Sequence, residues 1–217
     1  TAGANQKPGE TRLDLLKKNI SIHSSIMAEI RKQNCEGILI VVANPVDVLT
    51  LYAQKYSGMP ENRVFGSGTV LDTARLRYLI GNVDARSVHA YVIGEHGDSE
   101  IVTWSNANVS GVPLSDFFAL RGMQGIGDLE ASQKDIADDV KNAAYKIIEK
   151  KHATYYGIAA SVVRLCRAVL KDEKCVLPIS TCLHGEYGIS EVSLSVPAIV
   201  GRNGIEELVP VLLSEQE

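Results

Sequence analysis

An unbroken apolar run near the start of the chain limits what its first part can fold into. Residues 38–42 read Ile-Leu-Ile-Val-Val, with Gly37 before them and Asn44-Pro45 shortly after. A strand that exposes one face alternates apolar and polar residues, and this run does not alternate. We therefore expect a strand over residues 37–43 that lies parallel to a neighbour and is covered on both faces.

Helical patterns surround this strand. A helix over residues 11–32 is predicted from apolar residues on one face, at Leu13, Leu16, Ile20, Met27 and Ile30. Further helices are expected over 48–56 and 69–80, and a short strand over 63–66. This αβαβ order is typical of a doubly wound sheet, which binds ligands at the carboxyl ends of its strands. Three polar or small residues lie at such ends: Gly3, Asn44 and Ser67.

The second half of the chain is expected to be α+β, because its helices and strands are grouped differently. The predicted helices cover residues 136–150 and 156–170. The predicted strands cover residues 88–93, 176–183, 192–200 and 208–213, with a turn at 185–188. A shift in composition near Gly66 separates this part from the first.

Composition excludes several classes of function. The 217 residues are 45% hydrophobic and carry a formal net charge of -4, so no basic excess would attract nucleic acid or an anionic membrane. No apolar run approaches a membrane span and no signal peptide is visible, which favours a cytoplasmic protein. All four cysteines are interpreted as free thiols and no residue is assigned to a metal, although Cys175 and Cys182 could instead form a bridge or be ligands.

Three residues could together carry proton-transfer chemistry. Asp72 and Arg75 are three positions apart on a predicted helix, and His96 follows a predicted strand end. An imidazole held by a carboxylate can exchange the proton of an alcohol, while an arginine binds a substrate carboxylate with two bonds. From spacing alone, an exposed helical ion pair and a structural histidine are the more common interpretations.

A series of short strings makes the sequence similar to the L-lactate dehydrogenases. They occur in the order found in that family and cover nearly the whole chain: Thr1-Ala2-Gly3-Ala4, Gly9-Glu10-Thr11-Arg12, Asn44-Pro45-Val46-Asp47, Gly66-Ser67-Gly68, Leu71-Asp72-Thr73-Ala74-Arg75, Gly94-Glu95-His96-Gly97-Asp98, Ala153-Thr154-Tyr155-Tyr156, Leu194-Ser195-Val196-Pro197 and Gly201-Arg202-Asn203-Gly204. The resemblance implies an NAD-dependent oxidoreductase that interconverts pyruvate and L-lactate in fermentation.

The resemblance also assigns catalytic roles. His96 would accept a proton from lactate and return it to pyruvate, with Asp72 as its partner and Arg75 as the carboxylate clamp. Arg12 would lie on a mobile loop and polarise the substrate carbonyl when the loop closes. The alternative for Arg12 is a surface arginine at a helix start.

Three further residues would define the substrate pocket. Gln6 occupies the position that separates lactate from malate dehydrogenases, because a second substrate carboxylate would require an arginine there. Thr154 would complete the pocket on the methyl side, unless it is only a helix cap. Asn44 would bond to substrate, unless it is only a turn residue before proline.

The remaining assignments concern the cofactor and an effector. The resemblance places NAD against Gly3, Ala4, Ser25, Val42, Ala43, Asn44 and Ser67. Arg77 and His89 match residues that bind fructose 1,6-bisphosphate across a subunit interface in bacterial members activated by that sugar. The other interpretation is an exposed arginine and a strand histidine. A homotetramer is implied by the resemblance alone.

The expected fold is α/β, with the C-terminal part of a Rossmann-like doubly wound sheet followed by an α+β catalytic domain. Residues 1–66 would be a remnant of the NAD-binding domain and residues 67–217 the substrate-binding domain. About 80 residues with the Gly-rich phosphate turn are expected upstream, and the segment 80–84 is shorter than usual for the family. Three hypotheses follow: an L-lactate dehydrogenase, a malate dehydrogenase, or a non-catalytic fragment.

Overall fold

The computed structural model describes residues 3–4, 12–80, 83–122 and 126–217, and side chains in the helices are described from Leu16 and from Leu129 onward. The chain divides into two compact units, each treated by itself below. Among the described residues, no helix has both the length and the apolar character needed to cross a membrane.

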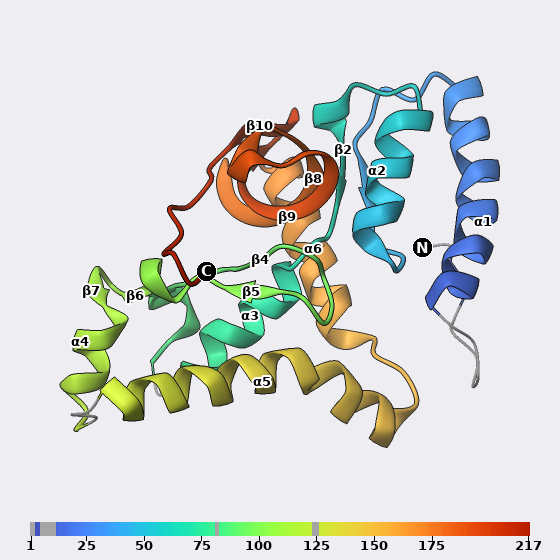
Figure 1. The fold of residues 1–217 in the computed structure, drawn as a ribbon. Helices are drawn as coiled ribbons and strands as arrows, with labels where there is room; N and C mark the ends of the chain where they lie inside the picture. The colour runs from blue at the N-terminus through green and yellow to red at the C-terminus, as the bar shows by residue number, and fades with distance from the viewer. Residues whose placement is uncertain (1–2, 5–11, 81–82, 123–125) are drawn as a thin grey trace. The chain divides into compact units, whose positions relative to one another are not determined.

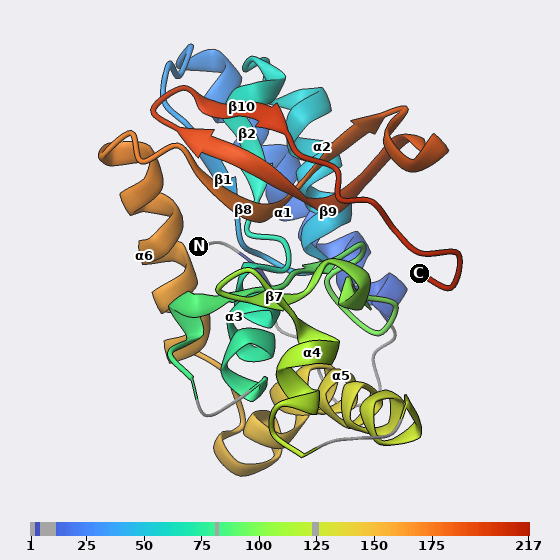
Figure 2. The same cartoon turned by 90° about the vertical axis from the view of Figure 1, so that its left-hand side faces the viewer.

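Unit 1 comprises residues 1–68 and 162–210 and is built on one mixed sheet. The sheet has the strand order β1-β2-β8-β9-β10, and the three C-terminal strands lie side by side in Figure 2. The strands are β1 (Leu39–Val41), β2 (Val64–Gly66), β8 (Cys175–His184), β9 (Ser190–Gly201) and β10 (Gly204–Leu208). The helices are α1 (Arg12–Lys32), α2 (Val46–Tyr56), the C-terminal part of α6 (Tyr156–Leu170) and the short 3-10 turns η1 (Glu61–Arg63) and η4 (Glu186–Gly188).

The sheet joins a parallel pair to antiparallel strands. β1 runs parallel to β2, as the apolar run predicts, and β8 pairs antiparallel with β2 through Gly66 and Ser180. Gly66 makes this close approach possible, since a Cβ there would lie 2.3 Å from Thr50 Oγ1 and 2.9 Å from Ser180 Cβ. Gly68 has φ +51° and equally little space beside β8. These glycines therefore serve strand packing.

The core of unit 1 lies between α1, α2 and the first strands. Met27 of α1 and Leu49 of α2 are almost fully buried against Val41 and Val64. Of the apolar face predicted for the first helix, Ile20, Met27 and Ile30 pack in this cluster. Two polar residues of α1, Asn19 and His23, are buried as well.

Unit 2 comprises residues 69–161 and 211–217, and its strands are short. β4 (Val92–Ile93) and β5 (Ile101–Val102) form a hairpin, while β3 (Val88–His89), β6 (Asn108–Val109) and β7 (Val112–Pro113) form a small sheet. The helices are α3 (Val70–Leu79), α4 (Leu114–Ala119), α5 (Ile126–Lys151), the start of α6, and the 3-10 turns η2 (Ala85–Ser87) and η3 (Trp104–Asn106), labelled in part in Figure 1. Leu76, Val92 and Val140 lie at the centre of its core.

Two strand predictions are wrong. The single strand expected over 88–93 is two strands in two different sheets, because β3 pairs with β6 and β4 pairs with β5, while residues 90–91 belong to neither strand. The strand expected over 208–213 is absent: β10 ends at Leu208, and the residues after it form no regular element. The helix expected from Ile136 begins ten residues earlier, at Ile126. Most residues in its first turns are polar, so the apolar periodicity from which the helix is predicted covers only its later part.

Candidate active site

Two threonines fasten α3 to the strand that leads into the site. Thr69 Oγ1 donates a hydrogen bond of 2.5 Å to the carbonyl of Val92, and Thr73 Oγ1 accepts one of 2.9 Å from the N–H of the same residue. Thr69 and Thr73 are one helical turn apart, so both reach β4 from the same side. Both polar backbone groups of Val92, which is fully buried, are thereby satisfied. This attachment fixes α3 against the hairpin that carries His96.

Asp72, Arg75 and His96 come together in unit 2. His96 lies in the loop between β4 and β5, and its Nδ1 is 2.6 Å from Asp72 Oδ2. The other carboxylate oxygen of Asp72 accepts a hydrogen bond of 3.0 Å from Arg75 Nη1. The Asp72 side chain is only 3% exposed, against 17% for Arg75 and 27% for His96. A buried carboxylate thus holds an imidazole and a guanidinium that are both partly open to solvent.

The Asp72–His96 contact determines which ring nitrogen can act. An ionised Asp72 accepts the proton on Nδ1 and favours the charged imidazolium by proximity. Proton exchange with a ligand would then use Nε2. The Arg75 guanidinium has five N–H donors, so its bond to Asp72 leaves donors for a two-bond contact with a ligand carboxylate.

Glu100 is a fourth residue of this site, and sequence reasoning missed it. Its carboxylate and the ligand atoms of Asp72 and His96 all lie within 4.8 Å of one another. Burial first, and then the charge of Asp72, raises the pKa of Glu100 to about 7, while His96, Arg75 and Lys141 act in the opposite direction. Its Oε1 is buried and has no hydrogen-bond partner among the described residues. Glu100 therefore changes charge near neutral pH beside the imidazole.

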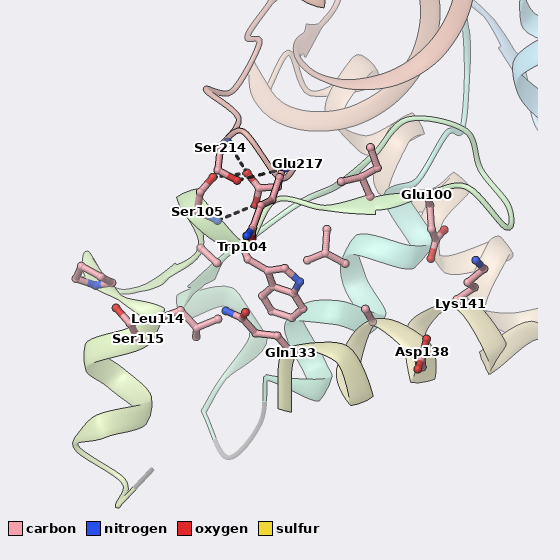
Figure 3. Close-up of a pocket in the computed structure, with 16 residues that line it drawn as sticks. Glu100, Trp104, Ser105, Leu114, Ser115, Gln133, Asp138, Lys141, Ser214 and Glu217 are labelled. Carbon is pink, nitrogen blue, oxygen red and sulfur yellow. Dashed lines mark hydrogen bonds between the residues drawn. The ribbon is translucent and has the colours of Figure 1, made fainter. Parts of the chain in front are cut away.

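A cavity of about 710 Å³ opens next to Glu100 but does not contain the Asp72–His96 pair. In Figure 3, Glu100 and Lys141 lie at one end of it and Leu114 and Ser115 at the other. At its rim, the N–H and hydroxyl of Ser105 donate hydrogen bonds of 2.9 and 2.5 Å to the Glu217 carboxylate. Because the reacting groups are elsewhere, we do not assign this cavity to the substrate.

In unit 1, the buried amide of Asn19 links two of the residues expected to contact the cofactor, Ala4 and Asn44. The N–H of Ala4 donates a hydrogen bond of 2.7 Å to Asn19 Oδ1, and Asn19 Nδ2 donates one of 2.6 Å to the carbonyl of Asn44. A Cβ on Gly3 would lie 3.1 Å from Ala43 Cβ. Asn19 itself is only 1% exposed. It ties together the two loop ends at which a doubly wound sheet binds its ligand.

The small residues at these loop ends fit a dinucleotide. Gly3 and Asn44 are exposed, whereas Val42 and Ala43 are partly buried directly after β1. Ser67 is buried after β2, and its N–H donates a hydrogen bond of 2.8 Å to the carbonyl of Val41. Larger side chains at Gly3 would meet Ala43, so the backbone stays open to a ligand only with small residues there.

Other predicted site residues are not brought into these groups by any contact described. Ser25 is exposed in the middle of α1, and its hydroxyl bonds the carbonyl of Ser21 at 3.3 Å. Thr154 is partly buried two residues before α6. Arg12 is the first residue of α1, but its side chain, like the whole of Gln6, lies outside the described residues.

Arg77, one of the two residues predicted to bind an effector, contacts the segment that directly follows the other, His89. Arg77 Nε donates a hydrogen bond of 3.1 Å to the carbonyl of Ala90, the residue after His89. The Arg77 guanidinium also lies 5.1 Å from the centre of the Tyr91 ring. His89 is exposed in β3, opposite Asn108 of β6. Arg77 therefore supports the segment between β3 and β4.

The geometry of Asp72, Arg75 and His96 defines a class of site. A carboxylate-bound imidazole beside an arginine suits proton transfer to a substrate that carries its own carboxylate. Oxidoreductases that act on 2-hydroxy acids need such a pair of functions, and the loop ends of unit 1 are compatible with a dinucleotide.

Comparison with known proteins identifies the family. Residues 1–66 match the family model described as lactate/malate dehydrogenase, NAD binding domain, and residues 69–217 match the one described as lactate/malate dehydrogenase, alpha/beta C-terminal domain. The chain belongs to the lactate/malate dehydrogenase family.

Close relatives refine this membership. The chain is 50% identical to L-lactate dehydrogenase 1 of Clostridium acetobutylicum and 52% identical to L-lactate dehydrogenase of Acetivibrio thermocellus, and all of it aligns with 69% and 68% of those proteins. Among solved structures, a lactate dehydrogenase from a Medee basin deep-sea metagenome library and the minor L-lactate dehydrogenase of Enterococcus mundtii each match the whole chain. Both show a TM-score of 0.92 and 46% identity, over 69% and 68% of their chains.

These matches confirm the α/β fold class and the expectation of an NAD-dependent oxidoreductase similar to L-lactate dehydrogenases. They do not test the roles of individual residues, the division at residue 66, or the effector.

Proposed function

We propose that the protein interconverts pyruvate and L-lactate, using NADH as reductant in fermentation. The observation that carries the proposal is the 2.6 Å contact between His96 Nδ1 and buried Asp72, with Arg75 bonded to the same carboxylate. Reduction of a 2-oxo acid requires a proton donor beside a carboxylate-binding group, and two side chains bonded to one carboxylate support such an arrangement. The relatives that carry the name L-lactate dehydrogenase support this choice.

In this mechanism, Arg75 binds the carboxylate of pyruvate and so orients the carbonyl toward His96. Protonated His96 donates its Nε2 proton to the carbonyl oxygen. Asp72 stabilises the imidazolium before this transfer, and afterwards it holds the neutral ring with its proton on Nδ1. NADH, when bound, supplies the hydride that reaches the carbonyl carbon. Gly3, Ala4, Ala43 and Asn44, fastened by Asn19, would hold the nicotinamide end.

Four residues complete the proposed site by resemblance. Arg12 would polarise the carbonyl oxygen and Gln6 would accept the methyl group while leaving a second carboxylate unpaired. Thr154 would border the methyl group, and Ser67 would line the cofactor groove. Ser25 has the weakest support, since its hydroxyl bonds its own helix.

The proposal is tested with His96→Asn in the purified protein. The variant should lose pyruvate reduction while NADH affinity, measured by fluorescence titration, stays close to that of the unchanged protein. Loss of NADH binding together with activity would instead make His96 a structural residue. The substrate assignment is tested separately: if oxaloacetate is reduced faster than pyruvate, the protein is a malate dehydrogenase and the role of Gln6 is wrong.

We also propose that fructose 1,6-bisphosphate activates the enzyme through Arg77 and His89 in a homotetramer. Two cationic groups facing their symmetry mates would repel until the bisphosphate neutralises them. The closeness of Arg77 to the His89 segment supports this. The sugar bisphosphate should lower the KM for pyruvate and favour the tetramer, and His89→Gln should weaken both effects. An unchanged KM together with an unchanged oligomeric state would contradict the proposal.

The domain division at residue 66 and the cytoplasmic location remain predictions.

A further inference from the structure

A cysteine, a histidine and a glutamate meet in unit 1, in residues to which the proposed reaction gives no role. The ligand atoms of Glu61, Cys182 and His184 all lie within 4.8 Å of one another. His184 Nε2 is 2.7 Å from Glu61 Oε1, although the two residues are 123 positions apart in the chain. Glu61 belongs to η1, while Cys182 and His184 lie at the end of β8. A thiol, an imidazole and a carboxylate are the three ligand types that Zn²⁺ takes in proteins.

The positions of two of these residues are fixed by other groups. The N–H of Cys182 donates a hydrogen bond of 3.0 Å to Gln54 Oε1, and Gln54 Nε2 bonds the carbonyl of Val64 at 2.9 Å. The N–H of His184 donates a hydrogen bond of 2.7 Å to Glu186. The pairing register of β8 with β9 shifts between Cys182 and His184. Supporting contacts of this kind orient metal ligands before the metal binds.

Burial and charge also suit a cation. Cys182 is 5% exposed, whereas the side chains of His184 and Glu61 are 55% and 46% exposed, so an ion could reach the thiol from solvent. The carboxylates of Glu186 and Glu191 add negative charge, and Lys55 is paired with Glu191 at 3.0 Å. Burial, followed by Glu61 and Glu191, raises the pKa of the Cys182 thiol. A bound cation would reverse this effect, since a coordinating thiol loses its proton.

We propose that Glu61, Cys182 and His184 form a transition-metal site that takes Zn²⁺ or a cation of similar preference, with water in the fourth position. Closing tetrahedral coordination requires small movements, because the ligand atoms already lie within 4.8 Å and bonds to zinc span about 2.0–2.3 Å. The metal would clamp η1 to the end of β8. Since it binds the folded unit, it would stabilise unit 1 by mass action.

Co²⁺ is the probe of choice, because its absorption reports both coordination geometry and a thiolate ligand. The metal-free full chain is titrated with Co²⁺ and then with Zn²⁺. We expect one Co²⁺ per chain, a thiolate-to-metal charge-transfer band, displacement by Zn²⁺ and a higher Tm with Zn²⁺. Because both the imidazole and the thiol must be deprotonated, affinity should rise with pH.

Three variants separate this site from adventitious binding. His184→Gln alters an exposed residue and should weaken Co²⁺ binding at least about tenfold, since even indirect contacts to metal ligands are worth that much. Cys182→Ser should abolish the charge-transfer band. Cys175→Ser, at the other end of β8, is the matched control and should change neither. The proposal is overturned if the unchanged protein shows no band, if His184→Gln binds Co²⁺ as well as the unchanged protein, or if the band disappears in Cys175→Ser.

Discussion

Two histidine–carboxylate pairs among the described residues have almost the same length and very different surroundings. His96 lies 2.6 Å from Asp72 in unit 2, and His184 lies 2.7 Å from Glu61 in unit 1. The Asp72 side chain is 3% exposed, whereas that of Glu61 is 46% exposed. Distance alone therefore does not distinguish the pair proposed for catalysis from the exposed pair.

The surroundings make the difference. Asp72 is bonded to Arg75 as well as to His96 and sits on a helix fastened by Thr69 and Thr73. With little water nearby, its charge acts strongly on the imidazole. Glu61 and His184 face solvent, where an ion pair contributes about 0–1 kcal/mol to stability. Their chemistry becomes specific only when a third group, the Cys182 thiol, is added.

The largest effect is expected where the buried carboxylate is neutralised. Asp72→Asn keeps the shape of the side chain but removes the charge that stabilises protonated His96. The kcat of pyruvate reduction should fall by ~10²–10⁴-fold, the usual contribution of acid–base catalysis. Asp139→Asn, at an exposed carboxylate 2.6 Å from Lys146, is the control and should leave kcat unchanged. If Asp72→Asn stayed within about tenfold of the unchanged protein, burial of this pair would have no catalytic meaning.

A middle-sized effect is expected where the buried pair is fastened to its scaffold. Thr73→Val removes the acceptor for the Val92 N–H at constant shape, leaving a buried donor unpaired. The free energy of unfolding should fall by ~1–3 kcal/mol, measured by urea denaturation. Thr50→Val in unit 1 is the matched control, because the buried Thr50 hydroxyl has no hydrogen-bond partner among the described residues. That exchange should be neutral or slightly stabilising, and equal losses in both variants would contradict the prediction.

The remaining effects concern the pH dependence of stability and have opposite signs in the two units. The Glu100 pKa is about 7 in the folded protein, against 4.5 ordinarily, so the folded state retains a proton that the unfolded state has lost. Stability therefore falls as pH rises between these values. Glu100→Gln should raise Tm relative to the unchanged protein at pH ~8 and leave it unchanged at pH ~4.

Glu186, beside the exposed pair, should behave in the opposite way. Its pKa is lowered because backbone N–H groups, first that of His184, donate to its carboxylate. Its stabilisation is present above its ordinary pKa and is lost as pH falls through the lowered one. Glu186→Gln should thus slightly lower Tm at pH ~8, and the loss should shrink toward acid. A Tm change of the same sign in both variants at pH ~8 would show that the two environments do not differ as described.

Much of this arrangement could be predicted from sequence, because its signals are local. The apolar run predicts parallel β1, and the three-residue spacing places Asp72 and Arg75 on one helical face. The ordered strings predict the family that the comparisons confirm. The pattern shows only that His96 follows a strand end and that Asp72 lies near a helix start. It leaves open whether the two side chains meet.

What sequence could not reveal depends on tertiary packing. Glu100 is one of many acids, and only burial distinguishes it. The single strand expected over 88–93 fails because its two halves pair with different partners. The four-residue spacing of Thr69 and Thr73 is only a weak indication that both side chains reach the same neighbouring strand. Asn19 could have been found as a polar residue on the apolar face of α1, between Leu16 and Ile20.

Asn19 also bears on the thermodynamics of cofactor binding. By accepting from the Ala4 N–H and donating to the Asn44 carbonyl, it orders two chain segments that would otherwise sample many conformations. A ligand arriving at these loop ends would not have to restrict them itself, so less conformational entropy is lost on binding. One buried amide would thus contribute to affinity by keeping the empty and occupied loops alike.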